Sequence, residues 1–212
     1  NATYLGGATD GCVARLSADG ARLLNFTFLG GSGAEGAWSM CLGPSGDVFV
    51  VGATTSSDLY VSPGAYCATC VPGVDQAVFV MRISGDLDSL VYGPYLDGEA
   101  WDQSRALRVD GSGVAYVAGA TNSSRFPTTT DAFDRSFDDA NDAHDGFVLA
   151  LSADGRSLVG STYLGGDWED ESYGLLLLSN GSVLVTGTTE SDGLATPGAL
   201  YPDTLGVPDA FL

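Results

Sequence analysis

Short runs in which apolar and polar residues alternate recur along the chain, separated by Gly, Asp, Ser and Pro. Period-two runs of this length predict β-strands. We expect four strands in each of three successive copies: 12–16, 23–29, 38–42 and 48–54; 78–83, 90–96, 105–109 and 115–121; and 147–151, 158–164, 173–178 and 183–189. The connections are too short for crossover helices and no stretch carries helix caps, so the strands should pair in antiparallel fashion.

The three copies superpose without a gap over residues 16–52, 83–119 and 151–187. Their period of about 65 to 70 residues indicates a unit that buries its apolar faces by packing on its neighbours. Each copy holds one glycine that we expect in a hairpin turn, namely Gly46, Gly113 and Gly181. The apolar residues that frame each copy should be buried at equivalent places: Leu16, Ile83 and Leu151, with Leu29, Leu96 and Leu164.

A four-stranded antiparallel unit repeated in tandem predicts an all-β fold made of β-propeller blades. The repeat cores are residues 10–54, 77–121 and 145–189, and the variable surface segments are 55–76, 122–144 and 190–208. Three copies are too few to close a ring, and the chain stops at Asp209–Leu212, inside a copy of a strand. We therefore expect residues 1–212 to be one segment of a larger, processed propeller, completed by further blades or by a partner.

Several short segments of the sequence closely resemble the tandem β-propeller repeat called SBBP, and they recur at matching positions of the copies. These segments are residues 114–121, 126–129, 145–151, 161–166 and 196–199. The resemblance implies a propeller from a large secreted or surface protein, without a defined enzymatic activity. The pattern is also similar to the NHL type of repeat. That similarity implies that Trp38–Leu42 begins a blade and that the long segment lies within it. The loop at Cys67–Cys70 and the acidic insertion at 138–145 depart from the usual repeat.

The charge balance narrows the choice of partners. The 212 residues include 27 Asp and Glu against eight Arg and no Lys, which gives a net charge of −19. Such a surface repels a phosphate backbone, so we expect no nucleic-acid partner and favour cations or basic proteins. No stretch approaches the 18 apolar residues of a membrane span, so we expect no transmembrane segment.

Four of the five asparagines stand in the acceptor pattern Asn-x-Ser/Thr: Asn1, Asn25, Asn122 and Asn180. Asn180 precedes Gly181 and also suits a hairpin turn. We favour N-glycosylation at two or more sites, with Asn25 and Asn122 expected to carry glycan. Glycans would place the chain outside the cell or at the cell surface, through the secretory pathway.

Four cysteines fit an oxidising compartment. Cys67 and Cys70 lie in a long irregular segment, and we expect a local disulfide between them, with a metal knuckle or a redox pair as the alternatives. Cys12 stands where other copies have Phe, so we interpret it as a small buried apolar residue. The sequence leaves open whether Cys12 meets Cys41.

One acidic residue recurs six positions after the second Leu of each copy: Glu35, Asp102 and Asp170. We favour a structural role in which each carboxylate accepts backbone N–H bonds across its turn. Calcium binding with nearby acids is the alternative, the neighbours being Asp97, Glu99, Asp167, Glu169 and Glu171. A denser candidate calcium site comprises Asp138, Asp139, Asn141, Asp142 and Asp145. This segment does not match an EF-hand loop, and the alternative is a solvent-exposed loop tip without a metal.

Residues typical of catalysis are sparse. The sole histidine is His144. The sequence contains no Gly-x-Ser-x-Gly motif that would present a nucleophilic serine to it, so we do not expect His144 to be catalytic. For Trp38, Trp101 and Trp168, near the acidic turns, we favour core packing over a sugar-binding platform. The chain is thus interpreted as a non-enzymatic extracellular structural or protein-interaction module of a larger cell-surface or filament-forming glycoprotein, whose partners are other subunits or domains. The alternatives are a calcium- or carbohydrate-binding lectin-like propeller, and a propeller glycoside hydrolase or lyase with acids partly from missing blades.

Overall fold

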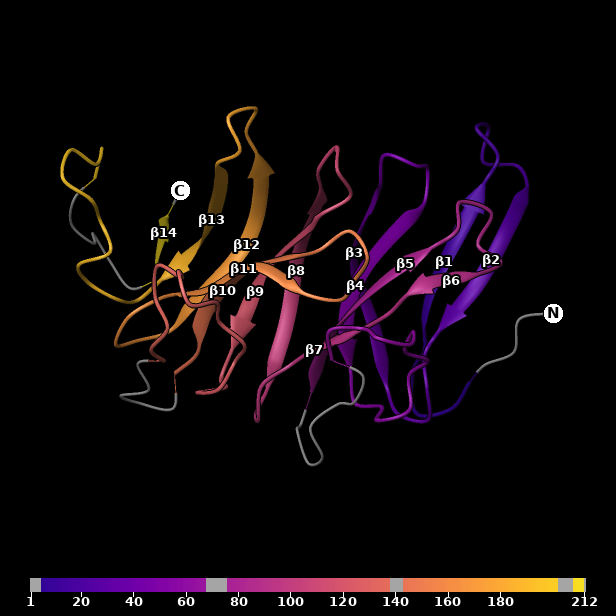
Figure 1. The fold of residues 1–212 in the computed structure, drawn as a ribbon, viewed down its shortest axis with the longest axis horizontal. Helices are drawn as coiled ribbons and strands as arrows, with labels where there is room; N and C mark the ends of the chain where they lie inside the picture. The colour runs from indigo at the N-terminus through magenta and orange to yellow at the C-terminus, as the bar shows by residue number, and fades with distance from the viewer. Residues whose placement is uncertain (1–4, 68–75, 138–142, 202–207, 212) are drawn as a thin grey trace.

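The computed structural model describes residues 5–67, 76–137, 143–201 and 208–211. These residues form fourteen β-strands, joined by turns and loops, and no helix. The strands form four antiparallel sheets, and Figure 1 shows these sheets following one another in chain order along the long axis. No helix long and apolar enough to cross a membrane occurs within these ranges. The all-β prediction is therefore confirmed.

Each sheet is built from strands that are close in sequence. The first sheet pairs β1 (Gly11–Leu16) with β2 (Leu23–Leu29). The second has the order β3 (Glu35–Leu42), β4 (Val48–Thr54), β5 (Ala77–Ile83) and β6 (Leu90–Tyr92), and β7 (Tyr95–Leu96) also pairs with β5. The third has the order β8 (Asp102–Val109), β9 (Ala115–Thr121), β10 (Asp145–Leu151) and β11 (Leu158–Leu164). The fourth comprises β12 (Asp170–Leu177), β13 (Val183–Thr189) and β14 (Asp209–Phe211).

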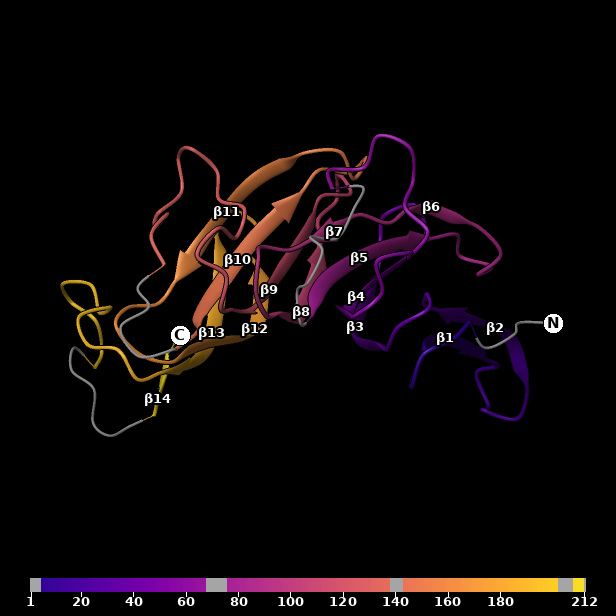
Figure 2. The same cartoon turned by 90° about the horizontal axis from the view of Figure 1, so that it is seen from below.

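The sheets combine strands from successive sequence copies. β3 and β4 come from the first copy, whereas β5, β6 and β7 come from the second. The second and third sheets therefore begin with the strand before the Gly hairpin, and the long segments between β4 and β5 and between β9 and β10 lie within a sheet. The described residues do not close into a barrel or a propeller ring. Figure 2 shows the β1–β2 pair at one end of the row of sheets.

The strand boundaries agree closely with those expected from alternation, with two differences. The run predicted at 90–96 is split into β6 and β7 at Gly93-Pro94, because proline has no N–H to donate to a ladder. The first strands of the last three sheets start three residues earlier than predicted, at Glu35, Asp102 and Asp170.

A β-bulge explains why these earlier starts were missed. In each first strand one extra residue interrupts the register with the second strand: Trp38, Arg105 and Tyr173. A bulge places two residues opposite one, so it shifts the alternation of faces by one position. The first three residues of each strand, which precede the bulge, therefore do not continue the alternation of apolar and polar residues that follows it.

The turn glycines and most of the framing residues lie where we expected them. Gly46, Gly113 and Gly181 have φ values of 85°, 89° and 89°, which is the left-handed region that glycine adopts without strain. Four of the six framing residues are buried: Leu29, Ile83, Leu96 and Leu151. Leu164 is half-buried.

The predicted burial of Leu16 is wrong, because its side chain is 57% exposed. The larger core cluster fills the space between the second and third sheets and includes Phe49, Leu107 and Phe147. Val13 of β1 and Leu29 of β2 belong instead to a second cluster, where they pack with residues of β5 such as Phe79 and Ile83. The other face of β1 meets no preceding sheet among the described residues, which explains the exposure of Leu16.

Candidate functional site

The recurring acids form one hydrogen-bonded motif in each copy, which we call the acid staple. In every copy the carboxylate accepts a hydrogen bond from the backbone N–H four residues earlier, from Gly31 to Glu35 at 2.9 Å, from Gly98 to Asp102 at 2.7 Å and from Gly166 to Asp170 at 2.9 Å. These bonds tie the end of one sheet to the first strand of the next. The predicted hydrogen bond from a backbone N–H to each of the three carboxylates is confirmed.

Threonine and serine from the end of the second strand complete the staple. Ser56 and Thr54 donate to Glu35 Oε1, and Thr121 and Ser123 donate to Asp102. In the third copy Ser191 donates to Asp170 Oδ2 at 2.7 Å, while Thr189 donates to the Ser191 carbonyl instead.

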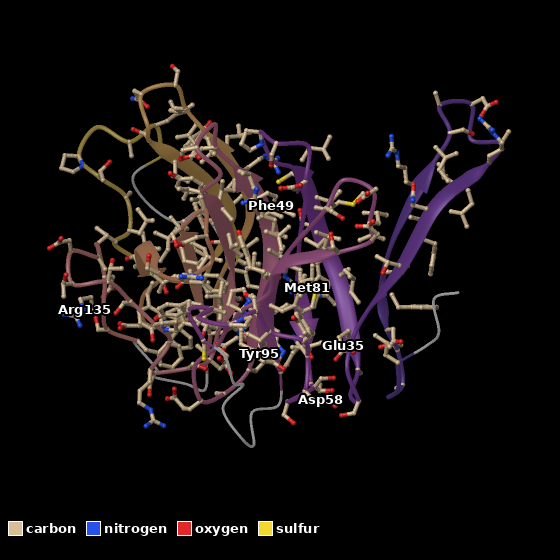
Figure 3. All side chains as sticks on the ribbon, turned by 45° about the vertical axis from the view of Figure 1, so that its right-hand side comes forward. Glu35, Phe49, Asp58, Met81, Tyr95 and Arg135 are labelled. Carbon is tan, nitrogen blue, oxygen red and sulfur yellow. The ribbon has the colours of Figure 1, made fainter. Side chains whose placement is uncertain are left out.

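All three staple acids are nearly inaccessible to solvent, with 3%, 0% and 0% of their surface exposed. Figure 3 shows Glu35 at the same end of the second sheet as Asp58, whose carboxylate accepts a hydrogen bond from Ser32 N–H. Burial raises the pKa of Asp102 to about 7, although hydrogen bonds from Thr121, Gly98 and Ser123 oppose the rise.

A charged cluster joins the third and fourth sheets. His144 Nε2 lies 3.0 Å from Glu171 Oε1, and Arg105 Nη2 donates to Glu171 Oε2 at 3.1 Å. The hydrogen bond to His144 and the nearby Arg105 hold the pKa of Glu171 at about 2, and Glu171 in turn raises the pKa of His144. The imidazole is therefore held within hydrogen-bonding distance of Glu171 and packs against Trp101, at 5.8 Å between ring centroids. This arrangement favours a structural role over a catalytic one for His144.

The face of β1 that carries Cys12 and Leu16 is open. Cys12 is exposed, whereas Phe79 and Phe147, at the same place in the repeat, are 1% and 0% exposed. The interpretation of Cys12 as a buried apolar residue is therefore wrong for the described chain, since no strand covers this face of β1. Figure 3 shows the β1–β2 pair projecting from the packed side chains of the other sheets, and Figure 2 shows the same pair at one end of the ribbon.

A cleft of about 720 Å³ lies between β1 and the β3–β4 hairpin. Its lining is apolar apart from one arginine: Val13, Ala14, Arg15, Leu16, Met40, Cys41, Leu42, Gly46, Val48, Gly85 and Leu87. Burial raises the pKa of the Cys41 thiol, so this cysteine remains protonated at neutral pH. The cleft therefore offers an apolar surface and contains neither a carboxylate nor an imidazole.

The predicted glycosylation residues lie in different surroundings. Asn180 is exposed in its hairpin turn, where its side-chain oxygen accepts a hydrogen bond from Ser182 N–H at 3.0 Å. Asn25 is half-buried on β2, and its Nδ2 donates to the Asp86 carbonyl at 2.9 Å. Asn122 is half-buried after β9, with its Oδ1 shielded from solvent. Asn1 lies outside the described residues.

The other predicted sites are only partly described. Cys70, Asp138, Asp139, Asn141 and Asp142 lie outside the described residues, so the local disulfide with Cys67 and the dense calcium candidate remain predictions. Asp145 is described and is 2% exposed at the start of β10. No group of three or more potential metal-binding side chains was found within the described ranges.

The tryptophans do not share the buried environment that we favoured for them. Trp38 and Trp168 are 53% and 49% exposed, and Trp101 is half-buried. Core packing is therefore wrong for Trp38 and Trp168. Trp38 is the bulge residue of β3, and the bulge is the reason that its side chain leaves the packed face.

The folded chain therefore presents a repeated hydrogen-bonded motif, a charged cluster between two sheets and one open apolar face. Its resemblance to the SBBP repeat remains an expectation. Comparison of the chain with protein-family models found no match, and a search among curated proteins also found none.

Proposed function

We propose that the chain is a segment of an extracellular β-propeller that acts as a structural and protein-interaction module without enzymatic activity. The observation that carries this proposal is the open face of β1. The same face is covered in the two complete sheets: Leu16 is 57% exposed, whereas Ile83 and Leu151 are 4% and 0% exposed. In this proposal the second and third sheets are one blade each, with β6 and β7 together as the fourth strand of the second sheet, and β1 and β2 are the outer half of another blade.

The partner that suits the free edge of β1 beside this face is another pair of strands of the same kind. β5, β10 and β14 each pair with a preceding strand, with a Phe opposite a Gly: Phe79 with Gly52, Phe147 with Gly119 and Phe211 with Gly187. Among the described residues β1 pairs only with β2, so in this proposal its other edge is available for strand addition. The apolar cleft beside it would be filled when the missing strands pack against β3 and β4. The module would thus be held in a larger assembly by neighbouring domains or subunits.

Association through this face can be tested by light scattering of the purified chain over a range of concentrations. We expect self-association that is weakened by the double change Leu16→Glu and Leu42→Glu, since both side chains are exposed and line the cleft. Phe133→Glu is the matched control, because Phe133 is 81% exposed and lies far along the chain in a loop. A chain that stays monomeric at every concentration, or a double variant that associates like the control, would contradict an interaction role for this face.

The secretory part of the proposal rests on the four Asn-x-Ser/Thr patterns. In protein secreted from eukaryotic cells we expect glycan at Asn180, which is exposed, and a lower occupancy at Asn122, whose amide oxygen is shielded. Peptide mapping before and after glycan removal measures both occupancies. Unmodified asparagine at all four positions would remove the support for a glycoprotein.

A further inference from the structure

The acid staple has a second carboxylate beside it in every copy. Directly after the second Leu of each copy stand Gly30, Asp97 and Gly165, and the strand of the preceding sheet contributes Asp10, Ala77 and Asp145 at equivalent positions. When glycine follows the second Leu, as at Gly30 and Gly165, the preceding sheet supplies Asp. When Asp follows it, as at Asp97, the preceding sheet supplies Ala. Each junction between sheets therefore has one additional acid, supplied from one of two places.

The glycines show that these carboxylates converge. A Cβ on Gly165 would lie 2.5 Å from Asp145 Oδ1 and 2.8 Å from Asp170 Oδ2. A Cβ on Gly30 would lie 2.6 Å from Glu35 Oε2 and 2.7 Å from Asp10 Oδ1. Since two oxygens lie so near one point in both cases, the two carboxylates of each pair lie close together, on the side of the glycine where a side chain would stand.

The junction between the third and fourth sheets has the most complete set of oxygen atoms. Asp145 and Asp170 are 2% and 0% exposed, and Asp170 Oδ1 is buried without a hydrogen-bond partner among the described residues. Ser172, two residues further along β12, is fully buried, and its hydroxyl is also without a partner there. A Cβ on Gly146 would lie 2.8 Å from this hydroxyl and 2.7 Å from the Leu164 carbonyl oxygen.

Two buried carboxylates at close range repel each other, and the hydrogen bonds described for Asp170 come only from the neutral donors Gly166 N–H and Ser191 Oγ–H. Carboxylate, hydroxyl and carbonyl oxygens are the ligands that calcium prefers in proteins. We infer that this junction binds a divalent cation of the calcium class through Asp145 and Asp170, with Ser172 and the Leu164 carbonyl as neutral ligands. The cation would fasten β10 of one sheet to β12 of the next.

Calcium chloride added to the EDTA-treated chain is the direct probe, read by isothermal titration and by the midpoint of thermal unfolding. We expect saturable binding, with an affinity of roughly 10⁻⁴–10⁻³ M as in extracellular calcium modules, and a rise in the midpoint. Asp145→Asn should abolish the rise at this junction. In EDTA the same variant should unfold at an equal or higher temperature than the unchanged chain, because one of two like charges is gone.

Asp167→Asn is the matched control, since Asp167 is exposed three residues before Asp170 and should leave the calcium response unchanged. Ser172→Ala keeps both charges and should weaken binding several-fold, so the proposal stays testable if Asp145→Asn does not fold. Replacing Asp138, Asp139 and Asp142 by Asn tests the competing acidic segment. The inference fails if the unchanged chain shows no calcium response, or if the response survives Asp145→Asn and disappears in the triple variant.

Discussion

Leu151→Ala is expected to lower the free energy of unfolding by about 2–5 kcal/mol, whereas Leu16→Ala should lower it by less than about 0.5 kcal/mol. The two leucines occupy the same position in the repeat. Leu151 is 0% exposed in the core between the second and third sheets, and Leu16 is 57% exposed on the open face of β1. The difference arises because removing buried methyl groups leaves a cavity, while removing exposed ones does not.

Urea denaturation of both variants, followed by tryptophan fluorescence, measures this contrast within one chain. If the proposed larger assembly forms, the same experiment in it should give a different result, because a neighbouring pair of strands would cover Leu16. Equal destabilisation of both variants in the isolated chain would mean that the first sheet is already covered, and the proposed open face would then be wrong.

Local sequence signals were sufficient for the turns and for the strands whose alternation no bulge or proline interrupts. The alternation of apolar and polar residues depends only on the two-residue period of a strand, so β4, β9 and β13 begin and end as predicted. The turn glycines could be identified for a similar reason, because a left-handed residue in a tight hairpin favours glycine whatever surrounds it. These features need no knowledge of which sheets are neighbours.

Exposure could not be predicted in the same way, since it depends on the neighbours of each sheet. Leu16 matches Ile83 and Leu151 in sequence, yet it has no sheet to pack against among the described residues. Trp38 was misjudged for a different reason, because the bulge in β3 changes the face on which its side chain emerges. Both errors arose because the periodic pattern contains information neither on the neighbouring sheets nor on a bulge within a strand.

The site was predictable only in part. The spacing of Glu35, Asp102 and Asp170 was regular enough to indicate a staple, and the staple is present in all three copies. Their second carboxylates were harder to recognise, because Asp145 precedes Asp170 by a full strand pair while Asp97 lies next to the turn of Asp102. The available signal was that two positions of the repeat vary together: the residue after the second Leu is Gly where the preceding strand supplies Asp, and Asp where it supplies Ala.

Gly119→Ala should be among the most destabilising changes in the chain, although it adds a single methyl group. A Cβ on Gly119 would lie 2.0 Å from the Gln103 carbonyl oxygen and 2.9 Å from the ring of Phe147. The carbonyl belongs to the backbone of β8 beside its bulge, so it cannot move without disturbing the ladder between β8 and β9. Gly52 and Gly187 face the same contacts, with Gly36 and Glu171 carbonyl oxygens at 2.0 Å and 1.8 Å. Glycine is therefore required in each copy by close packing, because the bulge brings two backbones together.

We expect Gly119→Ala to lower the free energy of unfolding by about 3 kcal/mol or more, at or above the upper end of ordinary overpacking. Gly160→Ala is the matched control, since Gly160 lies on β11 of the same sheet and a Cβ there would meet no atom within 4 Å. That change should leave stability unaltered or raise it by up to about 1 kcal/mol, because alanine restricts the unfolded chain more than glycine does. Thermal and urea denaturation of the two variants measure the difference. If Gly119→Ala were as stable as Gly160→Ala, the bulge would not bring β8 and β9 so close, and the recurrent glycine would need another explanation.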